Sequence, residues 1–170
     1  MENLARKKYF RRFDRFNPLE NKKLNMILKI PSYVYFAINE LGTAEIGGNE
    51  DNLQILEYLD SVKISKGHDE IPWCSGFVNW VMIQDGLKGT NKANAQSWLN
   101  WGVSIDKPKV GAVVVFKRGL EAWQGHVAIL LDWNDKYFMV VGGNQRNKVG
   151  IAYLPRDKVL GMRMEKKNES

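Results

Sequence analysis

A single cysteine and a distant histidine are the residues of this chain best suited to nucleophilic chemistry. Cys74 follows Pro72 and Trp73 at the start of one apolar pattern, and His126 follows a glycine at the start of another. A thiol attacks as its thiolate, which a neighbouring imidazole or a helix N-terminus stabilises. The pair therefore predicts a cysteine hydrolase, whereas a buried structural cysteine is the ordinary alternative for a lone thiol.

The residues after Cys74 predict the helix that would position the thiol. Apolar side chains recur at the three- and four-residue spacing of an amphipathic helix, at Cys74, Phe77, Val78, Val81 and Met82. Asp69 and Glu70 are suitable caps, and Gly86 is a suitable end. First-turn amides of Cys74 or Ser75 would favour the thiolate and stabilise an oxyanion.

The C-terminal half predicts an antiparallel sheet of about five strands. Short runs rich in Val, Ile, Leu and aromatic residues, separated by turn residues, occupy 111–116, 126–131, 137–141, 149–154 and 159–164. The intervening Asp132–Lys136 segment is a suitable hairpin turn between the second and third runs. The sheet would place the strand of His126 where the cysteine helix can pack on it.

The hairpin register selects a third residue to orient the imidazole. A hairpin centred near Asp135 places His126 opposite Asn144, at a separation where side chains touch. A shift of one residue exchanges Asn144 for Gly143 or Gln145. Asn144 is therefore the first candidate and Gln145 the second, because an amide can hold one imidazole nitrogen while the other addresses the thiol.

Two shorter helical patterns precede the cysteine. Pro31–Leu41 begins with a proline, and Asn52–Ser61 begins after Asp51, which with Gln54 could form a capping box. Both are expected to be scaffold. Glu45 lies between them and is a candidate lining residue of the substrate cleft.

Charge divides the chain into a basic extension and a neutral domain. Residues 1–30 hold nine Lys or Arg against three Asp or Glu, whereas residues 31–170 hold 16 of each sign, so the net charge of +6 lies in the extension. At 170 residues and 44% hydrophobic content, one core needs no disulfide or structural metal. We therefore expect an N-terminal extension at 1–30 and one catalytic domain at 31–170.

The extension has no apolar stretch of signal-peptide or transmembrane length. Its basic and aromatic residues would suit an anionic membrane, a wall polymer, a delivery machine or a docked segment. No nucleic-acid motif accompanies the charge, and no nucleic-acid partner is expected. Without a visible signal peptide, a wall enzyme made in the cytoplasm would need phage-type release or specialised secretion to reach the periplasmic or extracellular wall.

Several motifs, in their order along the chain, carry a family resemblance. They are Glu45-Ile46-Gly47, Pro72-Trp73-Cys74-Ser75, Phe77-Val78-Asn79-Trp80, Ser97-Trp98-Leu99, Gly125-His126-Val127 and Gly142-Gly143-Asn144-Gln145. Together they resemble a family of small bacterial and phage cell-wall hydrolases related to the CHAP and NlpC/P60 groups of papain-like cysteine amidases and peptidases. The resemblance runs from about residue 31 to residue 164.

The resemblance implies an α+β, papain-like fold in which helices, including the cysteine helix, pack on a curled antiparallel sheet. It implies a peptidoglycan hydrolase that cuts an amide of the stem peptide or the muramoyl–alanine linkage, with Cys74 as nucleophile, His126 as base and Asn144 as third residue. Many relatives carry an acidic residue at that third position, and none stands here. No cofactor or metal is implied. Peptidoglycan is the expected partner, with an immunity protein or delivery machinery if the chain is a secreted effector.

Four residues are candidates for the oxyanion site or the cleft, namely Ser75, Trp73, Gln145 and Glu45. Other chemistry remains open: His68 could replace His126 as base, or join both in a zinc site, although the spacing of a zinc motif is missing. The same dyad would also serve a thiol hydrolase, deamidase or acyltransferase acting on a protein. A wall-binding module without catalysis is the remaining alternative.

Overall fold

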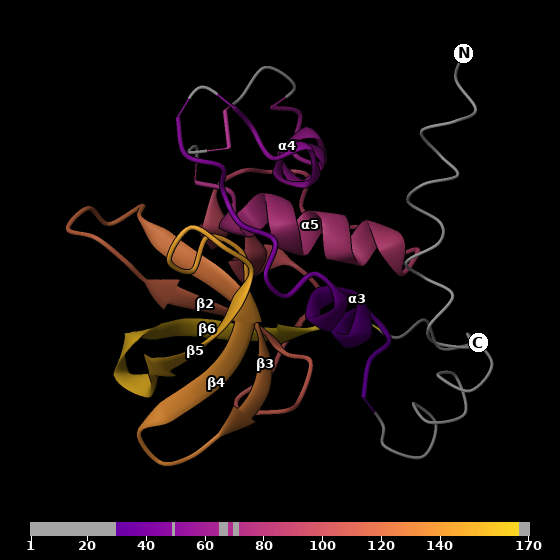
Figure 1. Ribbon diagram of the computed structural model, residues 1–170. Helices are drawn as coiled ribbons and strands as arrows, with labels where there is room; N and C mark the ends of the chain where they lie inside the picture. The colour runs from indigo at the N-terminus through magenta and orange to yellow at the C-terminus, as the bar shows by residue number, and fades with distance from the viewer. Residues whose placement is uncertain (1–29, 49, 65–67, 70–71, 167–170) are drawn as a thin grey trace. The chain divides into compact units, whose positions relative to one another are not determined.

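The computed structural model describes the chain from Ile30 to Lys166, with gaps at residues 49, 65–67 and 70–71 (Figure 1). The chain divides into two units, Met1–Ser32 and Tyr33–Ser170. All but the last residue of the predicted extension at 1–30 lies outside the described residues, so its role stays a prediction. No helix in the described ranges is long and apolar enough to cross a membrane.

In the described part of the chain, three α-helices and a 3-10 helix precede the main strands. They are α3 (Tyr33–Asn39), α4 (Leu53–Asp60), α5 (Cys74–Gln84) and η2 (Ala95–Asn100). The N-cap of α4 is Asn52, whose side chain accepts a hydrogen bond from the Gln54 amide at 2.9 Å. The predicted cap, Asp51, is thus wrong by one residue, and its carboxylate accepts the Asp69 amide at 3.0 Å instead.

Helix α5 begins at Cys74, as its apolar spacing predicts, and ends at Gln84 just before Gly86, whose φ is +73°. Its first nine residues are almost all buried, so the helix lies inside the molecule instead of showing one polar face. Gly76 permits the crossing of α4, because a Cβ there would lie 2.6 Å from the carbonyl oxygen of Tyr58.

The predicted cap of α5 is also different. Asp69 is almost fully buried, and its Oδ2 accepts the backbone amides of Ile46 and Asn52, each at 2.9 Å. It therefore ties down the loop before α4, since a buried carboxylate is stable only when hydrogen-bonded. Trp73 takes the N-cap position of α5, where no side-chain cap is formed among the described residues. Glu70, the other predicted cap, lies outside them.

A six-stranded antiparallel sheet follows. Its strands are β1 (Val103–Ser104), β2 (Val113–Lys117), β3 (Gly125–Trp133), β4 (Tyr137–Gly142), β5 (Gly150–Pro155) and β6 (Val159–Met164), in the order β1-β6-β2-β3-β4-β5. All five predicted strands are confirmed, and the two-residue β1 adds a sixth at one edge. The α+β class is therefore confirmed, with the cysteine helix packed on the sheet.

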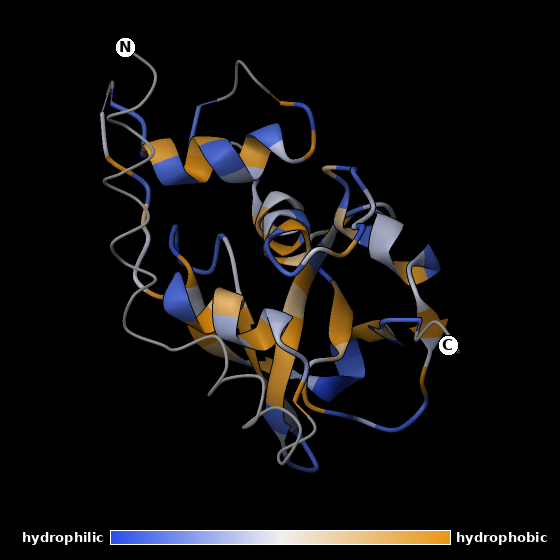
Figure 2. Ribbon diagram, turned by 90° about the vertical axis from the view of Figure 1, so that its right-hand side faces the viewer, coloured by the Kyte–Doolittle hydropathy of each residue, from blue (hydrophilic) through white to orange (hydrophobic). Residues whose placement is uncertain are grey.

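The two faces of the sheet have different neighbours. One face carries a buried cluster of Ala112, Val114, Phe116, Ala128, Leu130, Phe138 and Val140. Residues that alternate with these point the opposite way, toward α3 and α5, which contact β4, while α5 also contacts β3 (Figure 1). Figure 2 shows how hydrophobic the strands beneath the helices are. His126 alternates in step with Ala128 at the start of β3, and the backbone of Val127 beside it hydrogen-bonds Cys74, the first residue of α5.

The hairpin of β3 and β4 has the predicted register only near its middle. Ile129 pairs with Val141 and Leu130 with Val140, as predicted, and a bulge shifts the pairs nearer the turn. Pairing stops at Val141, so the first residues of β3, which include His126, pair with β2 alone. The sheet thus opens on one side of His126, where the site lies.

Candidate active site

The cysteine lies at the N-terminus of α5, against the open stretch of β3. Its side chain is buried, with 5% of the residue exposed. The backbone of Val127, the residue directly after His126, hydrogen-bonds the thiol, as do the backbone groups of Cys74 and Ser75. Pairing between β3 and β4 does not reach Val127, which leaves its backbone free of a β4 partner. The fold therefore brings the two predicted catalytic elements together.

The thiol is neutral in the resting site. Burial raises the pKa of Cys74 above its ordinary value, and this effect outweighs the Val127 hydrogen bond and the positive charge of Arg118, which lower it. The first-turn backbone groups of Cys74 and Ser75 do lower the pKa of the thiol, as predicted, but burial outweighs them. Desolvation wins because almost no water reaches the sulfur.

The imidazole is neutral as well. Burial, with a smaller contribution from the charge of Arg118, lowers the pKa of His126 from 6.5 to about 4, against the opposing effect of its hydrogen bond to Gln145. A neutral imidazole can accept a proton at neutral pH, which is the first requirement of a general base. Thiol and neutral imidazole, rather than thiolate and imidazolium, form the resting pair.

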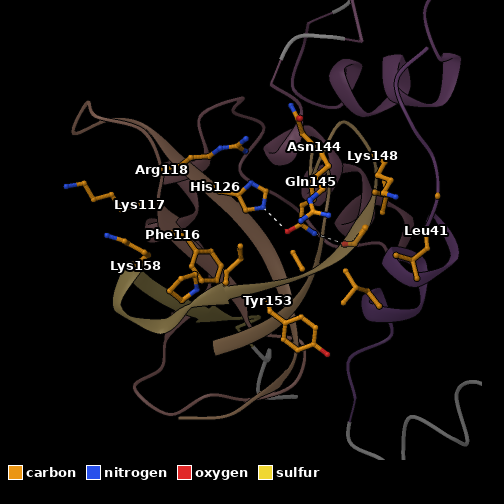
Figure 3. Close-up of a pocket in the computed structure, with 18 residues that line it drawn as sticks. Leu41, Phe116, Lys117, Arg118, His126, Asn144, Gln145, Lys148, Tyr153 and Lys158 are labelled. Atoms are coloured by element: carbon orange, nitrogen blue, oxygen red, sulfur yellow. Dashed lines mark hydrogen bonds between the residues drawn. The ribbon is translucent and has the colours of Figure 1, made fainter. Parts of the chain in front are cut away.

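Gln145 determines which imidazole nitrogen is free. Its side-chain Nε2 donates to the carbonyl oxygens of Gly150 at 2.5 Å and Gly142 at 3.3 Å. The amide oxygen is thereby directed at His126, with Oε1 3.3 Å from the imidazole Nε2 (Figure 3). Since an amide oxygen only accepts, His126 carries its proton on Nε2. Nδ1 is left as a lone-pair acceptor, buried and without a hydrogen-bond partner among the described residues.

The first candidate for this orienting contact, Asn144, does not make it. Asn144 lies beyond the end of β4 with φ at +53°, and Figure 3 shows its side chain directed away from the imidazole. The ladder between β3 and β4 ends at the Ile129–Val141 pair, so the extrapolated pairing of His126 with Asn144 is wrong. The turn residues Gly142, Gly143 and Asn144 are the sequence signal that the strand would end there.

Trp73 and Glu45 hold the turn that carries Gln145. Trp73 is fully buried, and its indole Nε1 donates to Glu45 Oε1 at 2.8 Å. The Glu45 amide donates to the carbonyl oxygen of Asn147 at 2.9 Å, which joins this loop to the turn after β4. Trp73 is thus a packing residue under the site, and Glu45 is its half-buried acceptor rather than an open cleft acid.

Gly143 lies where this turn passes over α5. A Cβ on Gly143 would lie 2.6 Å from Cζ3 of Trp73 and 2.6 Å from Cβ of Phe77. Such an approach is possible only for glycine, because real side chains do not pack that closely.

We expect Gly143→Ala to lower the free energy of unfolding by roughly 1–3 kcal/mol through overpacking, and to displace the adjoining Gln145. Chemical denaturation measures the first effect. Gly47→Ala is the matched control, since a Cβ there has nothing within 4 Å. Equal stability of the two variants would contradict the close packing described here.

Ser75 is buried and its hydroxyl is fully engaged. Ser75 Oγ donates to the Lys92 carbonyl oxygen at 2.6 Å and accepts from Trp98 Nε1 at 2.9 Å. Only its backbone amide remains for an oxyanion. His68 differs from the buried His126: its side chain is 82% exposed, and its Nδ1 lies 3.4 Å from Asp51 Oδ2. In the described ranges, no three His, Cys, Asp or Glu side chains are grouped to hold a metal ion.

A cavity of about 930 Å³ opens beside the imidazole (Figure 3). His126, Asn144 and Gln145 line one end of it, and the whole of β5 lines another side. Cys74 is not part of its wall. Sequence reasoning missed two residues here: Arg118, whose charge acts on both the thiol and the imidazole, and Phe116, which pairs with His126 across the sheet.

The depressed pKa of His126 predicts a pH dependence of stability. Between pH 6.5 and about 4 the unfolded chain binds a proton that the folded chain refuses, so stability is lost as pH falls through this window. We expect this one group to account for about 3 kcal/mol, on the order of 1.4 kcal/mol per pKa unit. Urea unfolding at pH 7 and 4.5 should therefore show a smaller pH effect for His126→Gln than for the unaltered protein. An unchanged pH effect would show that the imidazole titrates normally.

The candidate site thus consists of a buried thiol at the N-terminus of α5 and an oriented histidine on β3, the strand that α5 contacts. Residues 66–144 match the CHAP domain family, and the match contains both Cys74 and His126. This match confirms the resemblance to the CHAP and NlpC/P60-related cell-wall hydrolases that the motifs predict.

One solved structure is also similar. It is the crystal structure of a protein described as similar to lipoprotein, of the NLP/P60 family, from Staphylococcus aureus subsp. aureus Mu50. The two proteins are 21% identical with a TM-score of 0.42, over 75% of this chain and 45% of that one. This chain thus spans less than half the length of that protein. No curated protein sequence matches the chain.

Proposed function

We propose that this chain hydrolyses an amide bond of peptidoglycan, in the stem peptide or at the muramoyl–alanine linkage, with Cys74 as nucleophile and His126 as general base. The observation that carries the proposal is the contact of His126 Nε2 with the amide oxygen of Gln145, from which the tautomer follows. Gln145 holds its Nε2–H and leaves a bare, buried Nδ1 beside the strand residue that hydrogen-bonds the thiol. The family match supports peptidoglycan as the substrate class.

The first step transfers the thiol proton to Nδ1 as the sulfur attacks the carbonyl carbon of the scissile amide. No hydrogen bond joins thiol and imidazole among the described residues. Catalytic contacts of this kind commonly tighten only when substrate is bound. Arg118 assists this step at the sulfur, because its positive charge favours the thiolate.

The negative charge that forms on the carbonyl oxygen needs donors close to the sulfur. The first amides of α5 have no partners within the helix, and no side chain caps them among the described residues. The amides of Cys74 and Ser75, which hydrogen-bond the resting thiol, would turn to the oxyanion once the sulfur has attacked, aided by the helix dipole.

Collapse of the tetrahedral intermediate breaks the C–N bond, and Nδ1–H gives its proton to the leaving amine. Water then attacks the thioester, with Nδ1 taking its proton, and the acid product leaves as the thiol is restored. Gln145 acts throughout by holding Nε2–H, so that Nδ1 stays correctly oriented. Each step uses only groups of this chain and water.

The site of action that we propose is the wall outside the cytoplasm, reached by phage-type release or specialised secretion. The family match supports a wall substrate. An endolysin and a secreted antibacterial effector would use the same site, and an effector would require an immunity protein in the producing cell. Inhibition by a co-expressed neighbouring protein would identify the effector case.

Digestion of purified peptidoglycan, with products resolved by mass spectrometry, tests the proposal. New amino termini and a mass gain of one water at a single amide bond would support it and would identify the bond. Cys74→Ala is the control for contaminating hydrolases. A protein that leaves the wall intact but cleaves, deamidates or acylates a protein substrate would instead be a thiol enzyme of the alternative class. Wall binding without cleavage would indicate a binding module.

Simple thiol labelling does not separate these outcomes. The raised pKa of Cys74 makes alkylation by iodoacetamide slow at neutral pH even for an active enzyme. A mechanism in which His126 accepts the proton during attack does not need a resting thiolate. Product analysis is therefore the decisive measurement.

A further inference from the structure

The charged side chains that line the cavity beside His126 are all basic. Its wall contains Lys117, Arg118, Arg146, Lys148 and Lys158, and it contains no Asp or Glu. The basic side chains lie on both sides of the cavity, with Lys117, Arg118 and Lys158 on one side and Lys148 on the other (Figure 3). This distribution is local, because residues 31–170 carry equal numbers of basic and acidic residues.

These five cations are not neutralised within the described part of the chain. The salt bridge found there joins His68 to Asp51, and neither residue lines the cavity. Glu121 and Asp157 are near in sequence to Arg118 and Lys158, yet neither lines the cavity and neither forms an ion pair with them in the described residues. Clustered like charges repel, so an uncompensated cluster in a concavity attracts an anionic ligand.

The position of the cavity relative to the dyad indicates which part of a substrate enters it. His126 and Gln145 line the cavity, whereas Cys74 does not. The sulfur binds the acyl part of the scissile amide, and the imidazole hands its proton to the amine that leaves. The amine-side part of the substrate must therefore lie on the histidine side, which is the side of the cavity.

We propose that the cationic cavity binds the amine-side portion of the substrate and selects for free carboxylates on it. The inference rests on the proposed hydrolase function and adds the chemical class of the leaving fragment. Phe116, Ile151 and Tyr153 provide apolar surface in the same wall, so the ligand is an extended acidic peptide and not an isolated ion. The cations are solvent-exposed, so each contributes modestly and their effects are screened by salt.

Binding to the Cys74→Ala protein tests the inference without turnover. The probes are muropeptides released from the wall by a muramidase, used as free acids and after carbodiimide amidation of their carboxylates. Calorimetry should show the free acids binding about tenfold more tightly in low salt, a difference that shrinks in about 0.5 M NaCl. Equal affinity for the two forms would overturn the proposal.

A pair of double variants locates the effect. Lys117→Gln with Lys158→Gln should weaken binding of the free acids by roughly three- to tenfold and leave the amidated forms unaffected. Lys107→Gln with Lys109→Gln removes the same charge from exposed lysines outside the cavity wall and should change nothing. Equal weakening by both pairs would show a general charge effect and would contradict the site. Displacement by glycerol phosphate in preference to acidic muropeptides would assign the cavity to a phosphate polymer and overturn the peptide assignment.

Hydrolysis by the active protein distinguishes failure of this inference from failure of the proposed function. Equal cleavage of amidated and free-acid muropeptides would refute carboxylate selection but would leave the proposed hydrolase function standing. Absence of wall cleavage refutes the hydrolase, while the binding comparison still decides whether the cavity takes acidic peptides. Mass spectrometry of the two products identifies which of them carries the selected carboxylates. They should remain on the product with the new amino terminus. Their presence only on the acyl product would overturn the proposal.

Discussion

Replacing Cys74 with alanine should abolish cleavage of purified peptidoglycan while the protein stays folded. The change removes the atom that forms the covalent bond, and losses of this kind in hydrolases reach roughly 10⁴-fold or more in kcat. The packing cost is small by comparison, since one buried sulfur is lost and the side chain is otherwise kept, at about 1 kcal/mol. Release of soluble muropeptides measures activity, and circular dichroism with thermal unfolding checks the fold.

His126 and Cys74 should behave as one unit. If Nδ1 accepts the thiol proton, His126→Ala costs nearly as much activity as Cys74→Ala, and the double variant is scarcely worse than either single variant. Full additivity would show that the two residues act in separate steps. Cleavage retained by Cys74→Ala would remove the thiol mechanism altogether, whatever His126 does.

The elements that position this pair could be predicted because each depends on local periodicity. The five main strands follow from short β-branched runs between turn residues, and α5 from three- and four-residue apolar spacing after Cys74. Local periodicity does not predict that α5 and β3 lie together. That expectation rests on the order of motifs that the chain shares with a family, and the structure supplies the geometry through the contact of Val127 with the thiol.

What the sequence could not predict lies where tertiary contacts override local preference. Asp69 is a good capping residue by type, yet two amides of the loop before α4 take up its carboxylate. A helix N-terminus favours a thiolate, yet burial raises the pKa of Cys74. Arg118, just after β2, influences both candidate catalytic groups, and no spacing relates it to either of them.

The residue that orients the His126 imidazole shows most clearly how tertiary contacts limit prediction from sequence. Extrapolating a hairpin register along β3 is valid only while β4 continues, and β4 ends at Gly142. Beyond it, three non-glycine residues with positive φ, namely Asn144, Arg146 and Asn147, fold the chain back toward β5. The turn, not the ladder, therefore decides that Gln145 meets the imidazole.

Gln145→Ala should lower kcat by roughly 10²–10³-fold and leave KM nearly unchanged. Without the amide oxygen 3.3 Å from Nε2, the imidazole is free to rotate and to adopt the other tautomer, in which Nδ1 carries the proton and cannot accept one. The loss is part of the roughly 10²–10⁴-fold that acid–base catalysis contributes, and it is smaller than the loss of the nucleophile. Steady-state kinetics on soluble muropeptides separates kcat from KM.

Two matched variants make this prediction specific to the orienting contact. Asn144→Gly keeps the positive φ of the turn and should retain nearly full activity, because Asn144 makes no hydrogen bond to the imidazole in the described residues. Gln145→Glu keeps an acceptor near Nε2 but loses the Nε2 donor to Gly150 and Gly142, so partial activity is expected. A carboxylate there would also raise the pKa of His126, and the acid limb of kcat/KM should move to higher pH. Full activity of Gln145→Ala together with a crippled Asn144→Gly would assign the orienting role to Asn144 instead, and the turn would have to rearrange on substrate binding.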